Sequence, residues 1–291
     1  MAIIWVGTGR FSAYISPVQD YIDRVVAADV AAGNTLGLEV GVRNAYDVYI
    51  RDSINVGDLG TSGGVLSQAN SIIKASCIMA GARTLAGALV PLVGAAPTNF
   101  NFVAGDYDRK TGLTGSAINN TKYLNANRNN DAEASQNSKH YSLYVSSFPI
   151  IPDGATQSCP LIAAFGTTGG ASYSQIVVSA SSANQLPNQI LVRSNSTSTS
   201  SQSITPATGF IGTSRASSST VTLRNNNTNT SISQASAAPA SESTLLFQRS
   251  LNPGALTAGR LAFYSIGESL DLALLDARVT ALINAIAAAI P

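Results

Sequence analysis

The chain has little charge and little of the side-chain chemistry that enzymes and metal sites use most often. Of its 291 residues only 11% are charged, one is a histidine and two are cysteines, and the formal net charge is +1. Ordinary soluble domains carry more than twice this share of charge, so Ser, Thr, Asn and Gln must supply the surface polarity. The few Lys and Arg are scattered, which excludes a protein that follows nucleic-acid phosphates and a polybasic membrane-binding patch.

The chain also lacks obvious disulfide, secretion and membrane signals. Cys77 and Cys159 lie far apart in apolar surroundings, which favours buried free thiols over a disulfide, and no spacing indicates a metal site. Residues 1–11 have neither the basic region nor the long apolar run of a signal peptide. The most apolar tract, residues 75–96, is interrupted by Arg83, a proline and several glycines, so no membrane insertion is expected.

Residues 1–97 are predicted to form an N-terminal arm and a small helical unit. Pro17 stands where a first helical turn begins, and apolar residues follow at spacings of three and four until Gly33. A second helix is expected over residues 38–50 and a third over residues 65–80, both from the same periodicity. We expect this unit to dock the chain onto a larger particle.

Residues 98–268 have a sequence pattern that predicts an antiparallel β-sandwich. Short runs rich in β-branched and aromatic residues alternate with turn-forming Gly, Asn, Pro and Asp, about every ten residues. HYSLYVSSF, GFIGTSR, STVTLRN and GRLAFYSIG are four such runs. The sequence leaves open whether residues 150–258 contribute to one pair of sheets or contain an inserted lobe.

Residues 269–291 predict a strongly apolar C-terminal helix, with Ser269 or Asp271 as its N-cap. The seam at alternating spacings of three and four is formed by Leu272, Leu275, Val279, Leu282, Ile286 and Ala289. Such a helix must be buried, either against its own sandwich or between subunits. For the second alternative, a homodimer or homotrimer, the interface candidates are Leu275, Val279, Leu282 and Ile286.

Two stretches resemble a group of phage and prophage proteins with a concanavalin-like (laminin-G-like) jelly roll. The first is KASCIMAGARTLAGALVPLVGAAPTNFNFVAGDYDRKTGLTG at residues 74–115, followed by KYLNANRNN and HYSLYVSS. The second is GRLAFYSIGESLDLALLDARVTALINAI at residues 259–286. The resemblance implies a mainly β protein, a jelly-roll sandwich with a small helical N-terminal unit and a C-terminal apolar helix, in a virion surface or tail-associated protein.

The sequence offers no catalytic constellation. His140, the single histidine, has no identifiable nucleophile or orienting carboxylate, so a structural role at the start of a strand is favoured. A retaining glycosidase needs two carboxylates close together, and no strand offers them. We therefore predict that the chain is not an enzyme and has no catalytic residues and no cofactor.

Two features could bind ligands. Asp106 and Asp108, in GDYDRKTG, have the oxygen ligands that calcium prefers, although a turn closed by Asp side chains is favoured. Five tyrosines could stack on sugar rings if they were exposed, although packing in the core is favoured: Tyr123, Tyr141, Tyr144, Tyr173 and Tyr264.

The predicted function is that of a phage virion structural protein, associated with the tail, baseplate or tail fibre, that attaches to a host-surface glycan. Its expected partners are other virion proteins and copies of itself, and its expected location is the virion, assembled in the host cytoplasm. A capsid decoration or cement protein is the alternative, and a carbohydrate-active enzyme is disfavoured. The sequence does not identify the ligand-binding residues.

Overall fold

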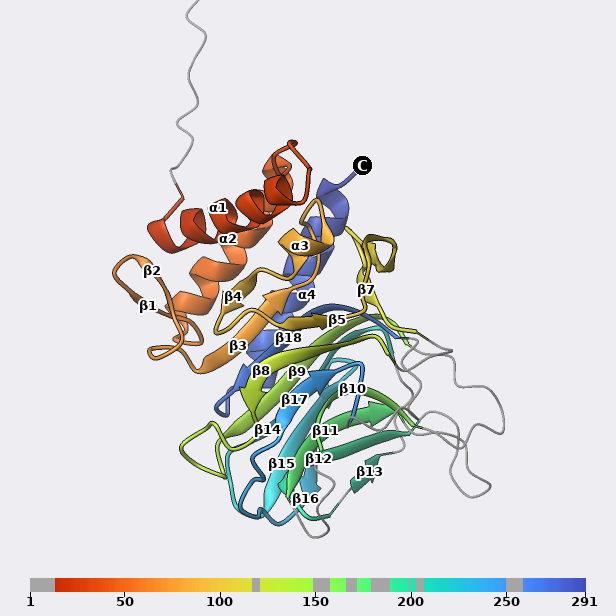
Figure 1. Ribbon diagram of the computed structural model, residues 1–291. Helices are drawn as coiled ribbons and strands as arrows, with labels where there is room; N and C mark the ends of the chain where they lie inside the picture. The colour runs from red at the N-terminus through yellow and green to blue at the C-terminus, as the bar shows by residue number, and fades with distance from the viewer. Residues whose placement is uncertain are drawn as a thin grey trace, which may run out of the picture.

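A layer of helices covers one face of a two-sheet β-sandwich (Figure 1). The structure is a computed structural model that describes residues 14–116, 121–148, 158–165, 172–178, 189–198, 200–202, 207–249 and 259–291. All pairs between the named strands of the two sheets are antiparallel. The prediction of a mainly β, antiparallel sandwich with a few helices is confirmed.

The three longer helices lie near the two ends of the sequence but pack together in space. The helices are α1 (Ser16–Ala31), α2 (Val40–Asn55), the short α3 (Leu85–Ala88) and α4 (Leu272–Ala289), with a 3-10 turn at Ala104–Asp106. As predicted, α1 has Pro17 in its first turn and ends before Gly33, whose φ is +89°. The side chain of Asp271 caps α4 by accepting hydrogen bonds from the backbone N–H groups of Ala273 and Leu274.

One sheet lies far from the helices and has seven strands in the described residues. Their order is β13 (Ser200–Gln202), β12 (Ile190–Ser196), β11 (Tyr173–Val178), β10 (Cys159–Ala164), β17 (Ser243–Leu246), β8 (Tyr123–Asn129) and β5 (Thr98–Phe100). We call this the outer sheet.

The other sheet lies between the outer sheet and the helices, and we call it the middle sheet. Its main order is β16 (Thr228–Ser233), β15 (Thr220–Asn225), β14 (Gly209–Arg215), β9 (Lys139–Ser147), β18 (Arg260–Gly267), β3 (Ile73–Ile78) and β4 (Pro91–Val93). A hairpin of β6 (Tyr107–Asp108) and β7 (Gly112–Thr114) joins β18. A separate hairpin is formed by β1 (Gly60–Ser62) and β2 (Val65–Ser67).

The middle sheet is buried on both faces, and this explains why its central strands have near-continuous apolar runs. On β18, Phe263 packs toward the helices, with its ring 5.8 Å from that of Tyr49 on α2, whereas Tyr264 belongs to the core between the sheets. Strands with two buried faces have near-continuous apolar runs. By contrast, β15, next to the edge strand β16, alternates, with Val221 and Leu223 inward and Thr220 and Thr222 less buried.

The third predicted helix, over residues 65–80, is wrong. These residues form β2 and β3, and β3 lies between β18 and the edge strand β4 in the middle sheet. Because β3 is buried on both faces, it lacks the alternation that marks a strand, and its apolar residues match a helical spacing by accident. The sandwich therefore already includes β3 and β4, so the expected division between residues 97 and 98 does not separate helices from sheets.

The described strands of residues 150–258 are divided between the two sheets, with β10 to β13 and β17 in the outer sheet and β14 to β16 in the middle sheet. The described part of this stretch therefore builds the sandwich and forms no separate lobe.

Helix α4 packs inside the single chain, between α2 and β14. Its four interface candidates, Leu275, Val279, Leu282 and Ile286, are at most 2% exposed. They are therefore not free for a subunit contact in this fold, and a homo-oligomer stays a prediction without an identified interface. By length and composition α4 could also cross a membrane, a test that core helices pass as well.

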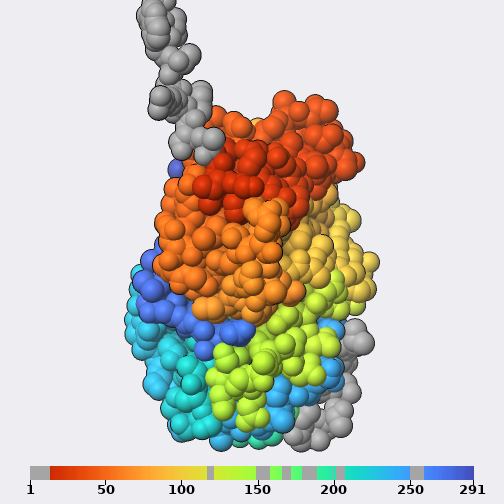
Figure 2. All heavy atoms as spheres, turned by 90° about the vertical axis from the view of Figure 1, so that its left-hand side faces the viewer, coloured from red at the N-terminus to blue at the C-terminus, as the bar shows by residue number. Residues whose placement is uncertain are grey.

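In the space-filling view of Figure 2, residues of the N-terminal helices and of the β1–β2 hairpin cover the upper half of the molecule, and strand residues fill the lower half. The two parts meet directly on this face. The helices are thus a layer of the fold, built on the sandwich.

Candidate functional site

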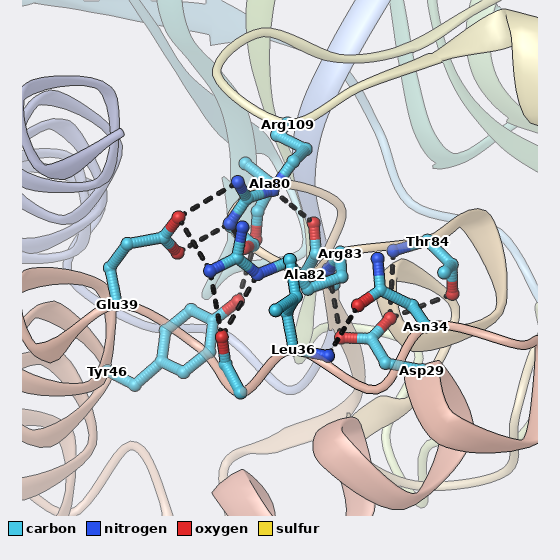
Figure 3. Close-up of polar contacts among 12 residues, drawn as sticks. Asp29, Asn34, Leu36, Glu39, Tyr46, Ala80, Ala82, Arg83, Thr84 and Arg109 are labelled. Carbon is cyan, nitrogen blue, oxygen red and sulfur yellow. Dashed lines mark hydrogen bonds and ion pairs between the residues drawn. The ribbon is translucent and has the colours of Figure 1, made fainter. Parts of the chain in front are cut away.

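The most prominent polar cluster joins the helical layer to the loops of the middle sheet (Figure 3). We call it the latch, and its members are Asp29, Glu39, Arg83, Thr84 and Arg109. The Glu39 carboxylate accepts hydrogen bonds from Arg109 Nη1 at 3.0 Å and Nη2 at 2.5 Å, and it pairs with Arg83 at 2.9 Å. This two-pronged geometry is the arrangement that a guanidinium and a carboxylate prefer.

Asp29 forms the second half of the latch. It is 1% exposed, and its carboxylate accepts hydrogen bonds from the backbone N–H groups of Arg83 and Thr84 and from the Thr84 hydroxyl, at 2.8 to 2.9 Å. Nearby, the Tyr46 hydroxyl donates to the Ala80 carbonyl at 2.8 Å. Gly81 sits beside it with φ of +91°, and a Cβ there would lie 2.5 Å from the Tyr46 hydroxyl oxygen.

The charged groups of the latch have their hydrogen-bond and ion-pair partners within the chain. Burial alone would raise the pKa of Glu39, but the hydrogen bonds and charge of Arg109, with the charge of Arg83, lower it overall. Arg109 also donates to the carbonyls of Gly81 and Ala82. With its charges paired inside the chain, the latch fixes the helices to the sheet and leaves no group for a ligand. Three of its members, Arg83, Thr84 and Arg109, come from residues 74–115.

His140 is structural in its geometry. It is fully buried, its Nδ1 lies 2.5 Å from the Glu268 carbonyl oxygen, and its Nε2 lies 3.0 Å from the Ser265 hydroxyl. Because a carbonyl only accepts, Nδ1 carries the proton and Nε2 accepts from the serine. Burial lowers the imidazole pKa to about 4, against which the bond to Glu268 acts only in part.

Asp106 and Asp108, the calcium candidates, are occupied by protein donors. Asp106 pairs with Lys122 at 2.6 Å and accepts from the Val103 N–H, and Asp108 accepts from the backbone and hydroxyl of Thr111. They close the turn that the sequence favours. In the part of the chain that the structure describes, no group of three His, Cys, Asp or Glu side chains is placed to hold a metal.

A pocket on the exposed face of the outer sheet is the best candidate for a binding site. It has a volume of about 290 Å³ and crosses β5, β8 and β17. Its lining residues are Phe100, Tyr123, Asn125, Asn129, Phe165, Ser241, Glu242, Ser243 and Leu245. Aromatic rings thus lie beside amide, hydroxyl and carboxylate groups, a composition typical of small-molecule sites. We call it the outer pocket.

Strand alternation places these side chains. Along β8, Leu124 and Ala126 point into the core between the sheets, so Tyr123, Asn125 and Asn129 face outward. Phe100 on β5 is the register partner of Tyr123, and their rings stack with centroids 4.3 Å apart and planes 9° from parallel. The pair forms a flat apolar wall next to the polar groups.

The polar groups of the outer pocket make fewer and longer hydrogen bonds to the protein than those of the latch. The side chain of Asn129 has only long contacts to Ser241 and Ser243, at 3.4 and 3.3 Å, although the side-chain Oδ1 of Asn125 accepts from the Asn127 N–H at 2.8 Å. Within the described residues, the Glu242 carboxylate has neither an ion pair nor a hydrogen bond. These groups can exchange water for a ligand at little cost.

Of the five tyrosines singled out in the sequence, only Tyr123 lines this pocket. Tyr141 and Tyr264 are buried between the sheets, and Tyr144 packs against the helical layer. Tyr173 is 9% exposed and packs on Phe165, with centroids 4.3 Å apart. The strand pattern around residue 123 could have indicated an outward ring, but the partner Phe100 could be found only from the sheet register.

A second hollow, of about 270 Å³, lies between α2 and α4. It is largely apolar, with Ala45, Val48, Ala281 and Ala285 among its lining residues. Val48 is 57% exposed. Nothing in the structure shows what covers this groove.

The comparisons with known proteins give similarity in fold only. No protein-family model and no curated protein match the chain. Among solved structures, a Trypanosoma rangeli sialidase is 8% identical with a TM-score of 0.46, over 83% of this chain and 39% of that one. The binding domain of botulinum neurotoxin serotype D is 13% identical with a TM-score of 0.46, over 71% and 50%.

Domain 4 of AbnA, an extracellular arabinanase from Geobacillus stearothermophilus, is 14% identical with a TM-score of 0.37, over 66% of this chain and 82% of that one. The chain spans about two-fifths to a half of the length of the sialidase and neurotoxin structures. TM-scores below 0.5 at such identities carry no argument about function.

The prediction that the chain is not an enzyme needs correction. Sialidases, which are enzymes, are among the matched structures beside binding domains. A missing sequence motif was too weak a ground for that conclusion, because carboxylates from distant strands can converge in a sandwich. Whether the chain has an activity is left open by the fold.

Proposed function

We propose that the chain is a carbohydrate-binding module whose ligand occupies the outer pocket. The observation that carries this proposal is the stacked Phe100–Tyr123 wall beside outward amide, hydroxyl and carboxylate groups. A sugar ring has apolar C–H faces that pack on aromatic rings and hydroxyls that hydrogen-bond to amides and carboxylates. The pocket offers both kinds of group on one rigid sheet.

The matched solved structures include the receptor binding domain of botulinum neurotoxin D and a domain in complex with arabinotriose, which agrees with a binding role without arguing for it. More specifically, we propose that the chain is a component of a phage particle, in the tail, baseplate or tail fibre, and that it attaches to a host-surface glycan. The two stretches that resemble phage and prophage proteins support this part. Many copies on one particle would turn weak single-site binding into firm attachment.

Substitution of Tyr123 tests the binding proposal. A glycan array identifies ligands of the full chain, and titration calorimetry then compares the wild type with Tyr123→Ala. We expect affinity to fall about ten-fold, because the ring supplies one wall of the site. Tyr14→Ala is the matched control: Tyr14 lies in the helical layer, bonded to Asn44. Equal loss in both variants, or no glycan bound by the wild type, would refute the proposal.

Immunogold labelling of intact particles with an antibody against the sandwich tests the location. Label on the tail or fibres is the expected result. Label spread over the head would instead support the capsid cement role, and absence of label from particles would rule out a virion component.

A further inference from the structure

Three buried polar side chains meet where the chain passes from β8 in the outer sheet to β9 in the middle sheet. Asn130 directly follows β8, Lys139 is the first residue of β9, and both are 1% exposed. Glu133 lies in the loop between them and is also buried. The Lys139 ammonium donates to the Glu133 carboxylate at 3.0 Å and to the main-chain carbonyl of Asn130 at 3.1 Å. An amine, a carboxylate and a side-chain amide are thus enclosed together.

The side-chain amide of Asn130 is poorly bonded for a buried group. Its Nδ2 has no hydrogen-bond acceptor among the described residues, and its Oδ1 has a long contact, at 3.4 Å, with the Tyr141 hydroxyl. Leaving a buried amide without partners is costly, so proteins keep few such groups. Because the Lys139 amine contacts the main chain of the same residue, the amide carbon Cγ of Asn130 lies close to a nucleophile.

The surroundings of Lys139 favour a reactive amine. Burial lowers the pKa of its ammonium, although the charge and hydrogen bond of Glu133 act against this. Glu133 is within reach to take a proton from the ammonium, and Arg128 holds the carboxylate in place, with its Nε 2.9 Å from the second oxygen. A desolvated lysine beside a base is a recognised arrangement for nucleophilic attack on a carbonyl carbon.

We propose that Lys139 and Asn130 form an intramolecular isopeptide bond, with Glu133 as the proton-transfer group. Nζ of Lys139 bonds to Cγ of Asn130, the Cγ–Nδ2 bond breaks, and Nδ2 is the leaving group. Two protons pass from the lysine ammonium, through Glu133, to the leaving nitrogen. The products are one secondary amide and one ammonium ion, so the reaction needs no oxidant and no co-reactant. A surface hollow of about 300 Å³, lined in part by Glu133, gives the ammonium ion a way out.

This bond joins the two sheets covalently, because β8 belongs to the outer sheet and β9 to the middle sheet. A cut by a protease in the loop of residues 131–138 then leaves the two parts of the chain linked, even when the protein is denatured. The bond does not depend on the proposed glycan binding, which uses the outer pocket.

Mass spectrometry of the denatured full chain tests the proposal. The wild type should be lighter than its sequence predicts by one ammonia, and peptide mapping should give a branched peptide that joins Lys139 to Asn130. Asn130→Ala and Glu133→Gln should have their full sequence masses and no branched peptide. Lys74→Arg is the matched control, because Lys74 also pairs with a carboxylate, that of Glu268 at 2.9 Å, and this variant should keep the loss of ammonia.

A wild type with its full sequence mass overturns the proposal, whether or not the variants fold. Loss of ammonia without a branched peptide also overturns it, because an asparagine that closes onto its own main chain loses the same mass. If the branched peptide forms in Glu133→Gln as completely as in the wild type, the role of Glu133 in proton transfer is overturned.

Discussion

The latch, between the helices and the middle sheet, and the outer pocket, on the outer sheet, are both polar clusters, yet they differ in how their groups are paired. In the latch, Glu39 and Asp29 have protein donors on each carboxylate. In the outer pocket, the Glu242 carboxylate has no partner among the described residues, and the amide of Asn129 has only long contacts.

How its polar groups are paired distinguishes a structural cluster from a candidate binding site better than the presence of charged residues does. A polar group buried with its partners stabilises one arrangement of the chain, since leaving either partner alone is costly. A polar group held at the surface by a rigid strand, with its hydrogen bonds made to water, is ready to bind something else. Substitutions on the helical side should therefore lower stability, and substitutions in the outer pocket should lower binding.

The largest effect is expected from Leu282→Asp on α4. Leu282 is 2% exposed in the core under the helices, so the change buries an unpaired charge and costs more than about 4 kcal/mol. Circular dichroism should show a chain that is unfolded or melts far below the wild type. Leu274→Asp is the control, because Leu274 is on the same helix but 52% exposed. A folded Leu282→Asp monomer would instead indicate that α4 serves a subunit interface.

The next effect is the pH dependence caused by His140. Its pKa is about 4 when folded and near 6.5 when unfolded, so the unfolded chain binds the proton more tightly. The contribution of neutral His140 to the free energy of unfolding is complete above pH 6.5. It is lost as the pH falls toward 4, which lowers the free energy of unfolding by about 3 kcal/mol.

His140 is the only histidine, so its ring signal in proton NMR is unambiguous. Titration of the folded protein should show no charging of the ring between pH 8 and 5. In His140→Gln, the fall in unfolding free energy over this range should be smaller than in the wild type. A ring that titrates near pH 6.5 would show that His140 is not buried as described.

The sequence predicted the strands of the sandwich where burial is one-sided or where turns bracket a short run. The run GFIGTSR is β14, Gly209–Arg215, and the periodic residues from Leu272 form α4. It failed at β3, because a strand buried on both faces loses the period of two. Local pattern therefore sufficed for these elements but gave the wrong type for β3.

The candidate site was predictable only in part. Tyr123 was recognised as a ring that could stack on a sugar, but its partner Phe100 comes from a strand 23 residues earlier. Glu242 looked isolated in sequence, and only the pairing of β17 with β8 brings it beside Asn129. Likewise the latch joins Asp29 to Arg83 across 54 residues. Such contacts depend on register and topology, which composition and spacing do not encode.

A smaller loss of stability is expected from Glu39→Gln in the latch. The change removes the charge that pairs with Arg83 and Arg109, and these side chains are about one-fifth exposed, so the cost should be about 1–3 kcal/mol. Because the pKa of Glu39 is lowered in the fold, its contribution is present above about pH 4.5 and is lost as the pH falls.

Urea unfolding of Glu39→Gln at pH 7 gives this cost directly. Asp47→Asn is the matched control, since it breaks only a local, partly buried pair with Arg51 one turn along the same helix, and such a pair contributes less than about 0.5 kcal/mol. Glycan affinity should be unchanged in both variants. Equal losses of stability would mean that the latch contributes no more than a surface ion pair.

The smallest effect on stability is expected from Asn129→Ala in the outer pocket. In contrast to Glu39→Gln, this variant should lose glycan affinity and keep its stability. Asn129 is exposed at the end of β8 and makes only long hydrogen bonds, so the free energy of unfolding should change by less than about 0.5 kcal/mol. Glycan affinity should fall several-fold, because an amide that hydrogen-bonds a sugar hydroxyl is lost. Urea unfolding and calorimetric titration of the same sample measure the two quantities. A variant that loses stability but keeps its affinity would place Asn129 with the latch and remove the distinction between the two clusters.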